Sequence, residues 1–418
     1  MNGIVFNNVR VFDGHPIAPF PAQVRVEANR ITHVVRHGEP LATRPDDQLY
    51  ECSGATLMPG LVDAQARLSW PSSVEKIVPY MTLPPEELAF TAARNARILL
   101  DHGYTSAYSA GSLNARVERC LADHIESGGL PGPRIVPSSL EHMPFPAMHE
   151  AGFKHQDEEP CGSTTEVVRA FVRASAAMGA RSVKFVLSAE DSLSFGASQP
   201  TLCTEAETRA AAEEAYRTGV WLAARAQTPS AIKLAVRYGF RVLYHCANAD
   251  EEALDLLEAA RQRIFIVPAI GIVEAALDAY RLTHRAMNGV SGSTVSASTA
   301  HVLHRQAVPQ MRARSVRVLP GRDHGLPFCP HGHHARALER FVQLLGYTPL
   351  ETLSAATVLG GQLMGFEGEL GRIHPGYLAD LLLVKGNPAQ EIALLQDKSN
   401  LLAIMKDGRF HKAPAEQC

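Results

Sequence analysis

The stretch Thr56-Leu-Met-Pro-Gly-Leu-Val-Asp-Ala-Gln-Ala-Arg-Leu68 decides the fold of this chain. Pro59 and Gly60 predict a turn that ends a short linker, and the apolar residues after them predict a buried strand over 61–64. When such a strand comes early in a long α/β chain, its last residues usually reach the mouth of an active site. Gln65 and Arg67, which follow the strand directly, are therefore candidate functional residues.

The composition is that of an ordinary enzyme. The 418 residues are 46% hydrophobic and 20% charged, with a net charge of −3, so nothing favours a nucleic acid or an anionic membrane as partner. We see no signal peptide and no apolar run long enough to span a bilayer. The seven scattered cysteines form no Cys-x-x-Cys pair and indicate reduced thiols. We expect a cytoplasmic protein with a small-molecule substrate, and a homo-oligomer is compatible with these features.

Strand-like and helix-like segments alternate through the middle of the chain, whereas both ends alternate apolar and polar residues like small antiparallel sheets. The pattern predicts a (β/α)8 TIM-type barrel over 59–369 and a small β-sandwich-like domain built from 1–58 and 370–418. The segment 280–313 reads as a helix, a loop and a helix. The expected barrel strands are 61–64, 106–110, 134–137, 182–187, 220–224, 242–244, 264–268 and 316–319.

Two motifs resemble the metal-dependent amidohydrolase superfamily, in its imidazolonepropionase- and prolidase-like branch. The run from Met58 to Ala64, with Leu68 after it, is similar to the first barrel strand of that family. The segment 371–380 is similar to the one in which the family's chain leaves the barrel. The resemblance implies the same fold, but the family's first strand ends in a metal-binding His-x-His, where this chain has Gln65-Ala66-Arg67.

The resemblance also assigns the family's other metal ligands to positions of this chain. Lys184, His245 and Asp323 match the family's carboxylated lysine, strand-6 histidine and strand-8 aspartate, but Arg225 stands where a strand-5 histidine is expected. Arginine has no available lone pair and stays charged. A guanidinium about 4 Å from a divalent ion opposes it by roughly 8 kcal/mol at an effective dielectric of about 20. We therefore expect no metal and no other cofactor.

These residues predict an enzyme that works by proton transfer and charge stabilisation. We expect Asp323, His245 and Lys184 to be catalytic, with His245 titrating near neutrality and the pKa of Lys184 lowered by the two arginines. Either Arg67 or Arg225 would pair with Asp323, and the two guanidinium groups could clamp an anionic or carbonyl-bearing substrate. Hydrolysis, elimination, isomerisation and cyclisation all fit such a site.

Several neighbouring residues are candidates for contact with the substrate, and each has a plainer reading as a packing or loop residue. The histidines of Cys329-Pro-His331-Gly-His333-His334 match no zinc-finger or zinc-ribbon spacing, so we expect a loop there. Two other functions stay open: a catalytically silent barrel that binds or assembles, and a zinc-dependent C–N hydrolase whose ligands are not recognised. The candidate substrate-binding residues beside the arginines are Gln65, Trp70, Tyr108, His149, His324 and His331.

Overall fold

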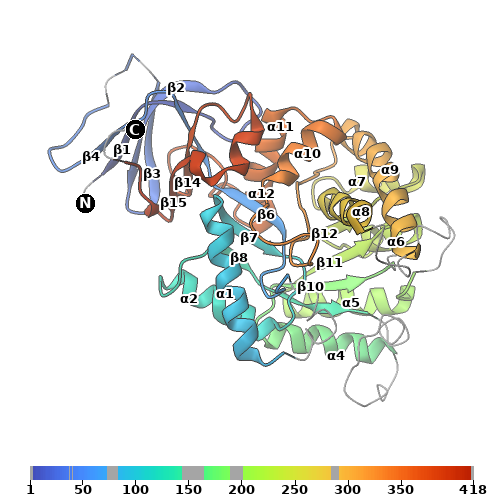
Figure 1. The fold of residues 1–418 in the computed structure, drawn as a ribbon. Helices are drawn as coiled ribbons and strands as arrows, with labels where there is room; N and C mark the ends of the chain where they lie inside the picture. Colours follow the sequence, from blue (N-terminus) through green and yellow to red (C-terminus); the bar gives the residue numbers. More distant parts are fainter. Residues whose placement is uncertain are drawn as a thin grey trace.

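The computed structural model describes residues 3–36, 38–39, 41–72, 83–143, 164–188, 201–283 and 291–415. For residues 279–283 and 291–297 it describes only the backbone. Figure 1 shows a sheet made from both ends of the chain beside a larger part in which strands and helices alternate. In the described part of the chain, no helix is both long and apolar enough to cross a membrane.

The sheet has the strand order β16-β15-β14-β5-β1-β2-β3, and β4 pairs with β1. The stretch expected to be a linker is largely the strand β5, so that expectation was wrong. All five residues of β5 are buried, because β5 lies between β1 and β14 and both of its faces are covered. The strands are β1 (Ile4–Val11), β2 (Phe20–Glu27), β3 (Arg30–Arg36), β4 (Gln48–Glu51), β5 (Ala55–Pro59), β14 (Leu381–Lys385), β15 (Leu401–Lys406) and β16 (Arg409–Lys412).

The remaining strands run parallel and form the barrel. Two sheets, β6-β7-β8 and β13-β12-β11-β10-β9, form most of the barrel wall. An isolated parallel β-bridge between Ile266 of β13 and Val318 marks the last strand position of the barrel. This α/β architecture is the predicted TIM-type barrel. Its strands are β6 (Leu61–Ala66), β7 (Tyr104–Ser109), β8 (Arg134–Val136), β9 (Ser138–His142), β10 (Ser182–Val186), β11 (Trp221–Ala226), β12 (Val242–His245) and β13 (Phe265–Val267).

The third barrel strand continues beyond the residue at which we expected it to end. Pro137 separates β8 from β9, and it lacks the N–H that a continuous ladder needs. The chain changes its pairing there, since β8 pairs with β7 and β9 pairs with β10. The carbonyl of Pro137 still accepts hydrogen bonds from the backbone N–H groups of Arg181 and Ser182. Glu141, which lies beyond the predicted end of the strand at residue 137, is therefore part of a barrel strand.

Helices cover the outside of the barrel (Figure 1). Their starts follow from the sequence: the side chains of Asn114, Thr204, Thr228 and Asp250 each accept a hydrogen bond from the first turn of a helix. Of the expected helix, loop and helix over 280–313, the two helices are α8 and α9, and 284–290 lie outside the described residues. The helices are α1 (Pro85–Asp101), α2 (Ala115–Glu126), α4 (Thr164–Ala177), α5 (Glu205–Thr218), α6 (Pro229–Arg237), α7 (Glu251–Ala259), α8 (Ile270–Thr283), α9 (Ser291–Ala313), α10 (Arg336–Leu345), α11 (Pro349–Ser354) and α12 (Gly360–Met364), with a π-helical turn at Ala355–Leu359.

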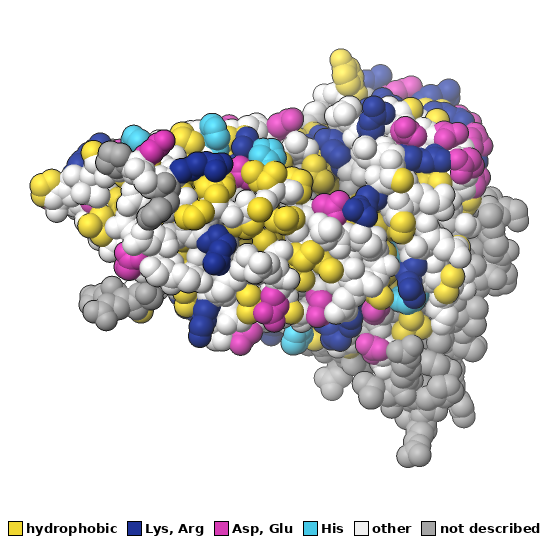
Figure 2. All heavy atoms as spheres, turned by 90° about the horizontal axis from the view of Figure 1, so that it is seen from above, with side chains coloured by type: hydrophobic (Ala, Val, Ile, Leu, Met, Phe, Trp, Pro, Cys, Tyr) yellow, Lys and Arg dark blue, Asp and Glu magenta, His cyan; other side chains and the backbone are white. Residues whose placement is uncertain are grey.

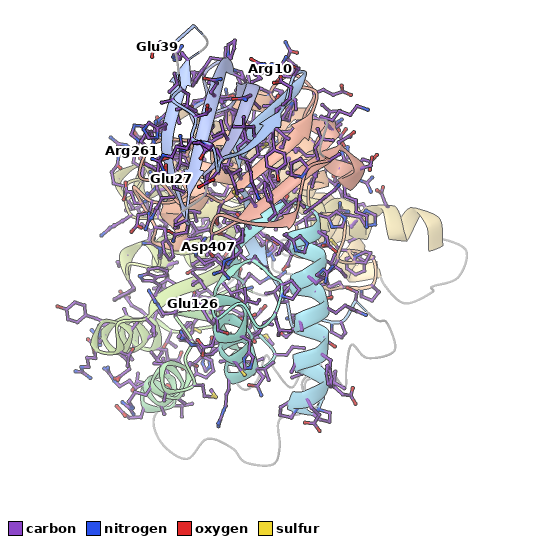
Figure 3. All side chains as sticks on the ribbon, turned by 90° about the vertical axis from the view of Figure 1, so that its left-hand side faces the viewer. Arg10, Glu27, Glu39, Glu126, Arg261 and Asp407 are labelled. Carbon is purple, nitrogen blue, oxygen red and sulfur yellow. The ribbon has the colours of Figure 1, made fainter. Side chains whose placement is uncertain are left out.

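A large hollow of about 1260 Å³ lies where the sheet meets the amino ends of the barrel strands. Its lining includes Arg134 and Arg181, which lie at the starts of β8 and β10. It also includes Asp407 and Glu126, which Figure 3 shows at the lower end of the sheet and on α2 below it. On the face drawn in Figure 2, acidic and basic side chains are interspersed with hydrophobic ones. Because active sites of such barrels lie at the carboxyl ends of the strands, this hollow is at the opposite end from the expected site.

Candidate active site

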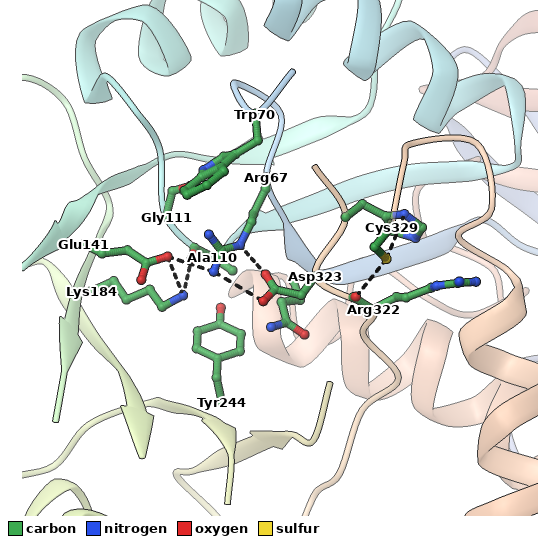
Figure 4. A network of polar contacts seen from close by, with 12 residues as sticks. Arg67, Trp70, Ala110, Gly111, Glu141, Lys184, Tyr244, Arg322, Asp323 and Cys329 are labelled. Carbon is green, nitrogen blue, oxygen red and sulfur yellow. Dashed lines mark hydrogen bonds and ion pairs between the residues drawn. The ribbon is translucent and has the colours of Figure 1, made fainter. Parts of the chain in front are cut away.

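A cluster of four charged side chains lies at the carboxyl ends of the barrel strands (Figure 4). Arg67 follows β6, Glu141 belongs to β9, Lys184 belongs to β10 and Asp323 follows the last barrel position. Parallel strands bring these side chains together although they are far apart in the sequence. Their side chains are 7%, 15%, 1% and 4% exposed, respectively, so the charges compensate one another rather than being solvated.

Arg67 joins two carboxylates. Its Nε and Nη2 both donate to the carboxylate of Asp323, with 3.3 Å between Nη2 and Oδ2, and Nη2 also lies 2.8 Å from Oε1 of Glu141. The ring of Trp70 lies against the guanidinium, with 4.6 Å from Cζ to the ring centroid. Burial disfavours the charged form, but attraction by Asp323 and Glu141 outweighs it and raises the pKa of Arg67. The arginine that pairs with Asp323 is therefore Arg67.

Lys184 is an unusual buried amine. Its Nζ donates to the backbone oxygen of Ala110 at 2.5 Å and to Oε1 of Glu141 at 3.0 Å, and it lies 4.6 Å from the ring centroid of Tyr244. Burial, helped by Arg67 and opposed by Glu141, lowers the pKa of Lys184 to about 8. The expected direction is confirmed, but burial contributes more than the arginines. An appreciable fraction of Lys184 is therefore neutral near pH 8.

Glu141 is the charged residue of this cluster that the sequence analysis did not select. Burial opposes its ionisation, but the positive charges of Arg67, Lys184 and Arg225 lower the pKa of Glu141 to about 2. Gly111 makes room for it: a Cβ at Gly111 would lie 2.8 Å from Oε1 of Glu141. A carboxylate within reach of the end of a strand was a usable signal. It was missed because Pro137 was interpreted as the end of that strand.

The prediction that His245 titrates near neutrality was wrong. Burial, with the nearby charge of Arg225 and the ring of His304, holds the pKa of His245 well below its usual range. His245 is therefore a neutral, weakly basic imidazole at pH 7. The backbone at His245 and at Asp323 is left-handed, with φ of 73° and 58°, a strained conformation that often occurs at functional sites.

Other predicted residues lie near this cluster or away from it. Gln65 is fully buried, and neither polar atom of its amide has a hydrogen-bond partner among the described residues. Tyr108 lies in the barrel interior, where it donates to Oγ of Ser182 at 2.9 Å and stacks on Trp221. These two partners begin β10 and β11, so Tyr108 is not brought to the carboxyl-end cluster. His149 lies outside the described residues.

The histidines of the loop after the last barrel position form a second, separate group. The rings of His324 and His334 lie 3.9 Å apart, and His331 lies 5.9 Å and 5.6 Å from them, measured between ring centroids. Nε2 of His331 donates a hydrogen bond of 3.2 Å to the backbone oxygen of Trp70, whose ring lies against Arg67. Burial lowers the pKa of all three, that of His331 to about 4, so they are neutral at pH 7.

The residues present do not fit a divalent metal. The resemblance assigns metal ligands to the positions of Gln65, Arg67, Lys184, Arg225, His245 and Asp323. The guanidinium of Arg67 already holds both oxygens of Asp323, and Lys184 is engaged by two acceptors. Across the described ranges, no three or more His, Cys, Asp or Glu side chains are grouped so as to hold a metal ion. Positively charged side chains at the positions assigned to metal ligands repel a metal ion rather than bind it.

The barrel and the sheet built from both ends of the chain define the class of protein. The profile of the amidohydrolase family matches residues 56–410, and the chain belongs to this family. It is an enzyme of the amidohydrolase superfamily.

Two curated relatives agree with this assignment. The ochratoxinase of Aspergillus niger is 25% identical over 388 residues, which cover 86% of this chain and 76% of the relative. The imidazolonepropionase of Rubrobacter xylanophilus is 41% identical over 64 residues, 15% of each chain. A solved Xaa-Pro dipeptidase with bound methionine superposes with a TM-score of 0.83 at 23% identity, and covers 99% of this chain and 100% of its own. This last similarity shows the fold alone.

Proposed function

We propose that this protein is a metal-independent enzyme that acts on a small anionic or carbonyl-bearing molecule by acid/base catalysis and charge stabilisation. One observation carries the proposal: the guanidinium of Arg67 lies between the carboxylates of Asp323 and Glu141, where the family resemblance places a metal centre. A fixed positive charge at this place can stabilise negative charge that develops on a substrate, as a metal ion would.

Lys184 is the best placed base in the cluster. With a pKa of about 8 it can accept a proton near neutral pH, whereas the imidazolium form of His245 is disfavoured by burial and by the charge of Arg225. In this proposal Asp323 holds Arg67 in place, and Arg67 and Arg225 stabilise an oxyanion, enolate or carboxylate of the substrate. With Lys184 charged, the positive charges of Arg67, Arg225 and Lys184 favour a transition state that carries negative charge on the substrate.

The reaction class within this proposal is hydrolysis or an elimination, isomerisation or cyclisation. Hydrolysis is favoured by the amidohydrolase family, to which the chain belongs. Proton transfer without water activation is favoured by the amine of Lys184 and the cationic surroundings, since water activation is a task that metals perform well. We further propose a cytoplasmic location, for which the scattered cysteines are the only support. We also propose that the protein has no nucleic-acid or membrane partner.

The proposal is tested by metal analysis together with turnover. Native protein is purified without added metal, its metal content is measured by mass spectrometry, and substrates are sought in a panel of small amides, lactones and enolisable carboxylic acids. We expect substoichiometric metal, turnover that a chelator does not reduce, and loss of turnover in Lys184→Met. Stoichiometric zinc, with activity that chelator removes and zinc restores, would instead establish the zinc-dependent C–N hydrolase.

A silent barrel that only binds is the second candidate function. It is favoured because the charged groups of the cluster already pair with one another: Arg67 contacts two carboxylates, and the side chain of Lys184 is 1% exposed. The same panel separates the two, because a silent barrel retains ligands without converting them. Lys184→Met would then change binding and leave every ligand chemically intact.

A further inference from the structure

The cluster is organised around a carboxylate held by cations, the reverse of a metal centre. One oxygen of Glu141, Oε1, lies 2.8 Å from Nη2 of Arg67 and 3.0 Å from Nζ of Lys184. The charge of Arg225 also acts on this carboxylate, since it contributes to lowering the pKa of Glu141. Figure 4 shows Arg67 and Lys184 directed toward Glu141 from different strands. This is the geometry of a carboxylate-binding site that a side chain of the protein already fills.

We propose that Arg67 and Lys184, with the charge of Arg225, form a recognition site for the carboxylate of a small-molecule ligand, and that Glu141 fills this site until the ligand displaces it. The proposal deepens the function proposed above, on whose charge-based site it rests, and it names the substrate class: a small organic carboxylate.

Exposure separates Glu141 from the other carboxylate of the cluster. The side chain of Glu141 is 15% exposed and that of Asp323 is 4% exposed, so Glu141 is the one nearer to solvent. Asp323 accepts two hydrogen bonds from Arg67, whereas Glu141 accepts one contact from that guanidinium. If Glu141 leaves, Arg67 therefore remains fixed by Asp323, and its Nη2 is available to an incoming carboxylate in an unchanged position.

Charge compensation then selects the ligand. When Glu141 leaves, the positive charges of Arg67 and Lys184 are no longer fully compensated, and an uncompensated charge in a buried site raises the free energy of the protein. A ligand carboxylate restores the balance, but a neutral amide of the same shape does not, so the site discriminates by charge. The surroundings suit the organic part of such a ligand. Trp70 presents an aromatic ring beside Arg67 and donates through Nε1 to the backbone oxygen of Gly111 at 3.2 Å, next to Glu141.

Trp70 provides a direct reporter, since the chain has two tryptophans and Trp221 packs on Tyr108 in the barrel interior. In a Trp221→Phe background, chelator-treated protein is titrated with formate, acetate and acetamide while the fluorescence of Trp70 is recorded. We expect Glu141→Ala to bind acetate at least about tenfold more tightly than the background protein, because no internal carboxylate competes. Acetamide should bind to neither protein.

Glu274→Ala is the matched control. Glu274 is 19% exposed and pairs with one arginine, Arg340, at 2.7 Å, so its removal uncovers a single cation in place of a group of cations. We expect this variant to leave the acetate titration of Trp70 unchanged. If Glu141→Ala is too unstable for titration, its thermal midpoint should rise with acetate more than with chloride. Glu141→Gln, which keeps the shape but not the charge, should show the same preference.

The inference is overturned if Glu141→Ala binds acetate no more tightly than the background protein, or binds acetamide equally well. It is also overturned if acetate and chloride stabilise both Glu141 variants equally. Turnover does not enter these measurements. A protein that binds carboxylates in this way and converts none would support the inference and remove the proposed catalytic function.

Discussion

Replacement of Arg67 by methionine tests the electrostatic core of the site. Methionine keeps much of the side-chain volume but removes the guanidinium that joins Asp323 to Glu141. Asp323 is 4% exposed and would be left as an uncompensated carboxylate, a change that typically costs about 3–5 kcal/mol. For a chain of 418 residues, with an unfolding entropy of about 0.9 kcal/mol/K, this loss lowers the thermal midpoint by about 3–6 °C.

The assay is thermal unfolding followed by circular dichroism at pH 7, with Arg237→Met as the control. Arg237 pairs with Glu205 at 3.4 Å with both side chains more than half exposed, so its loss should cost less than about 0.5 kcal/mol. The double variant Arg67→Met/Asp323→Leu should recover part of the stability, because both charges of the buried pair are then removed. A midpoint for Arg67→Met equal to that of Arg237→Met, or simple additivity in the double variant, would refute the reasoning.

Four further changes test the other parts of the site. The folded pKa of Lys184, about 8, lies below its value in an unfolded chain, so the stability of the protein should rise with pH between 8 and 10.5, and Lys184→Met should lose this rise in urea titrations. The pKa of Glu141 is lowered to about 2, so the stability that its ionisation gives is complete above pH 4.5 and is lost as the pH falls toward 2; Glu141→Gln should flatten this acid limb. The pKa of His331 is lowered to about 4, and that of His334 also lies below its usual range, so the stability of the protein should fall as the pH drops from 6.5 toward 4. Thermal midpoints measured across this range should fall less in His334→Phe. Gly111→Ala should destabilise by about 1–3 kcal/mol and reduce turnover, because its φ of +125° suits glycine and the new Cβ would press on Glu141; unaltered stability of this variant would contradict the contact.

Much of the fold follows from short-range patterns in the sequence. The alternation of strands and helices predicted the barrel, and the turn at Pro59 and Gly60 placed the start of β6 correctly. Two strands were missed for different reasons. The residues of β5, which ends at Pro59, were interpreted as a linker. β9 was missed because Pro137 was taken as the end of the strand, although a sheet tolerates a missing N–H where a strand exchanges partners.

The candidate site was predicted in part. Arg67, Lys184 and Asp323 come together because the ends of parallel strands converge, which their sequence positions indicate. Their roles in catalysis stay predictions. The position of Tyr108 and the pKa of His245 were not accessible, because side-chain direction and burial depend on how the whole barrel packs.

The interruption of the third barrel strand at Pro137 has a mechanical consequence. The main-chain ladder on one side of this proline holds β8 to β7, and on the other side it holds β9 to β10, so a single residue forms the seam between the two halves of the wall. Small displacements of β9 need not propagate into β8. Since β9 carries Glu141 and β10 carries Lys184, a shift at the seam would move both partners as one unit relative to Arg67.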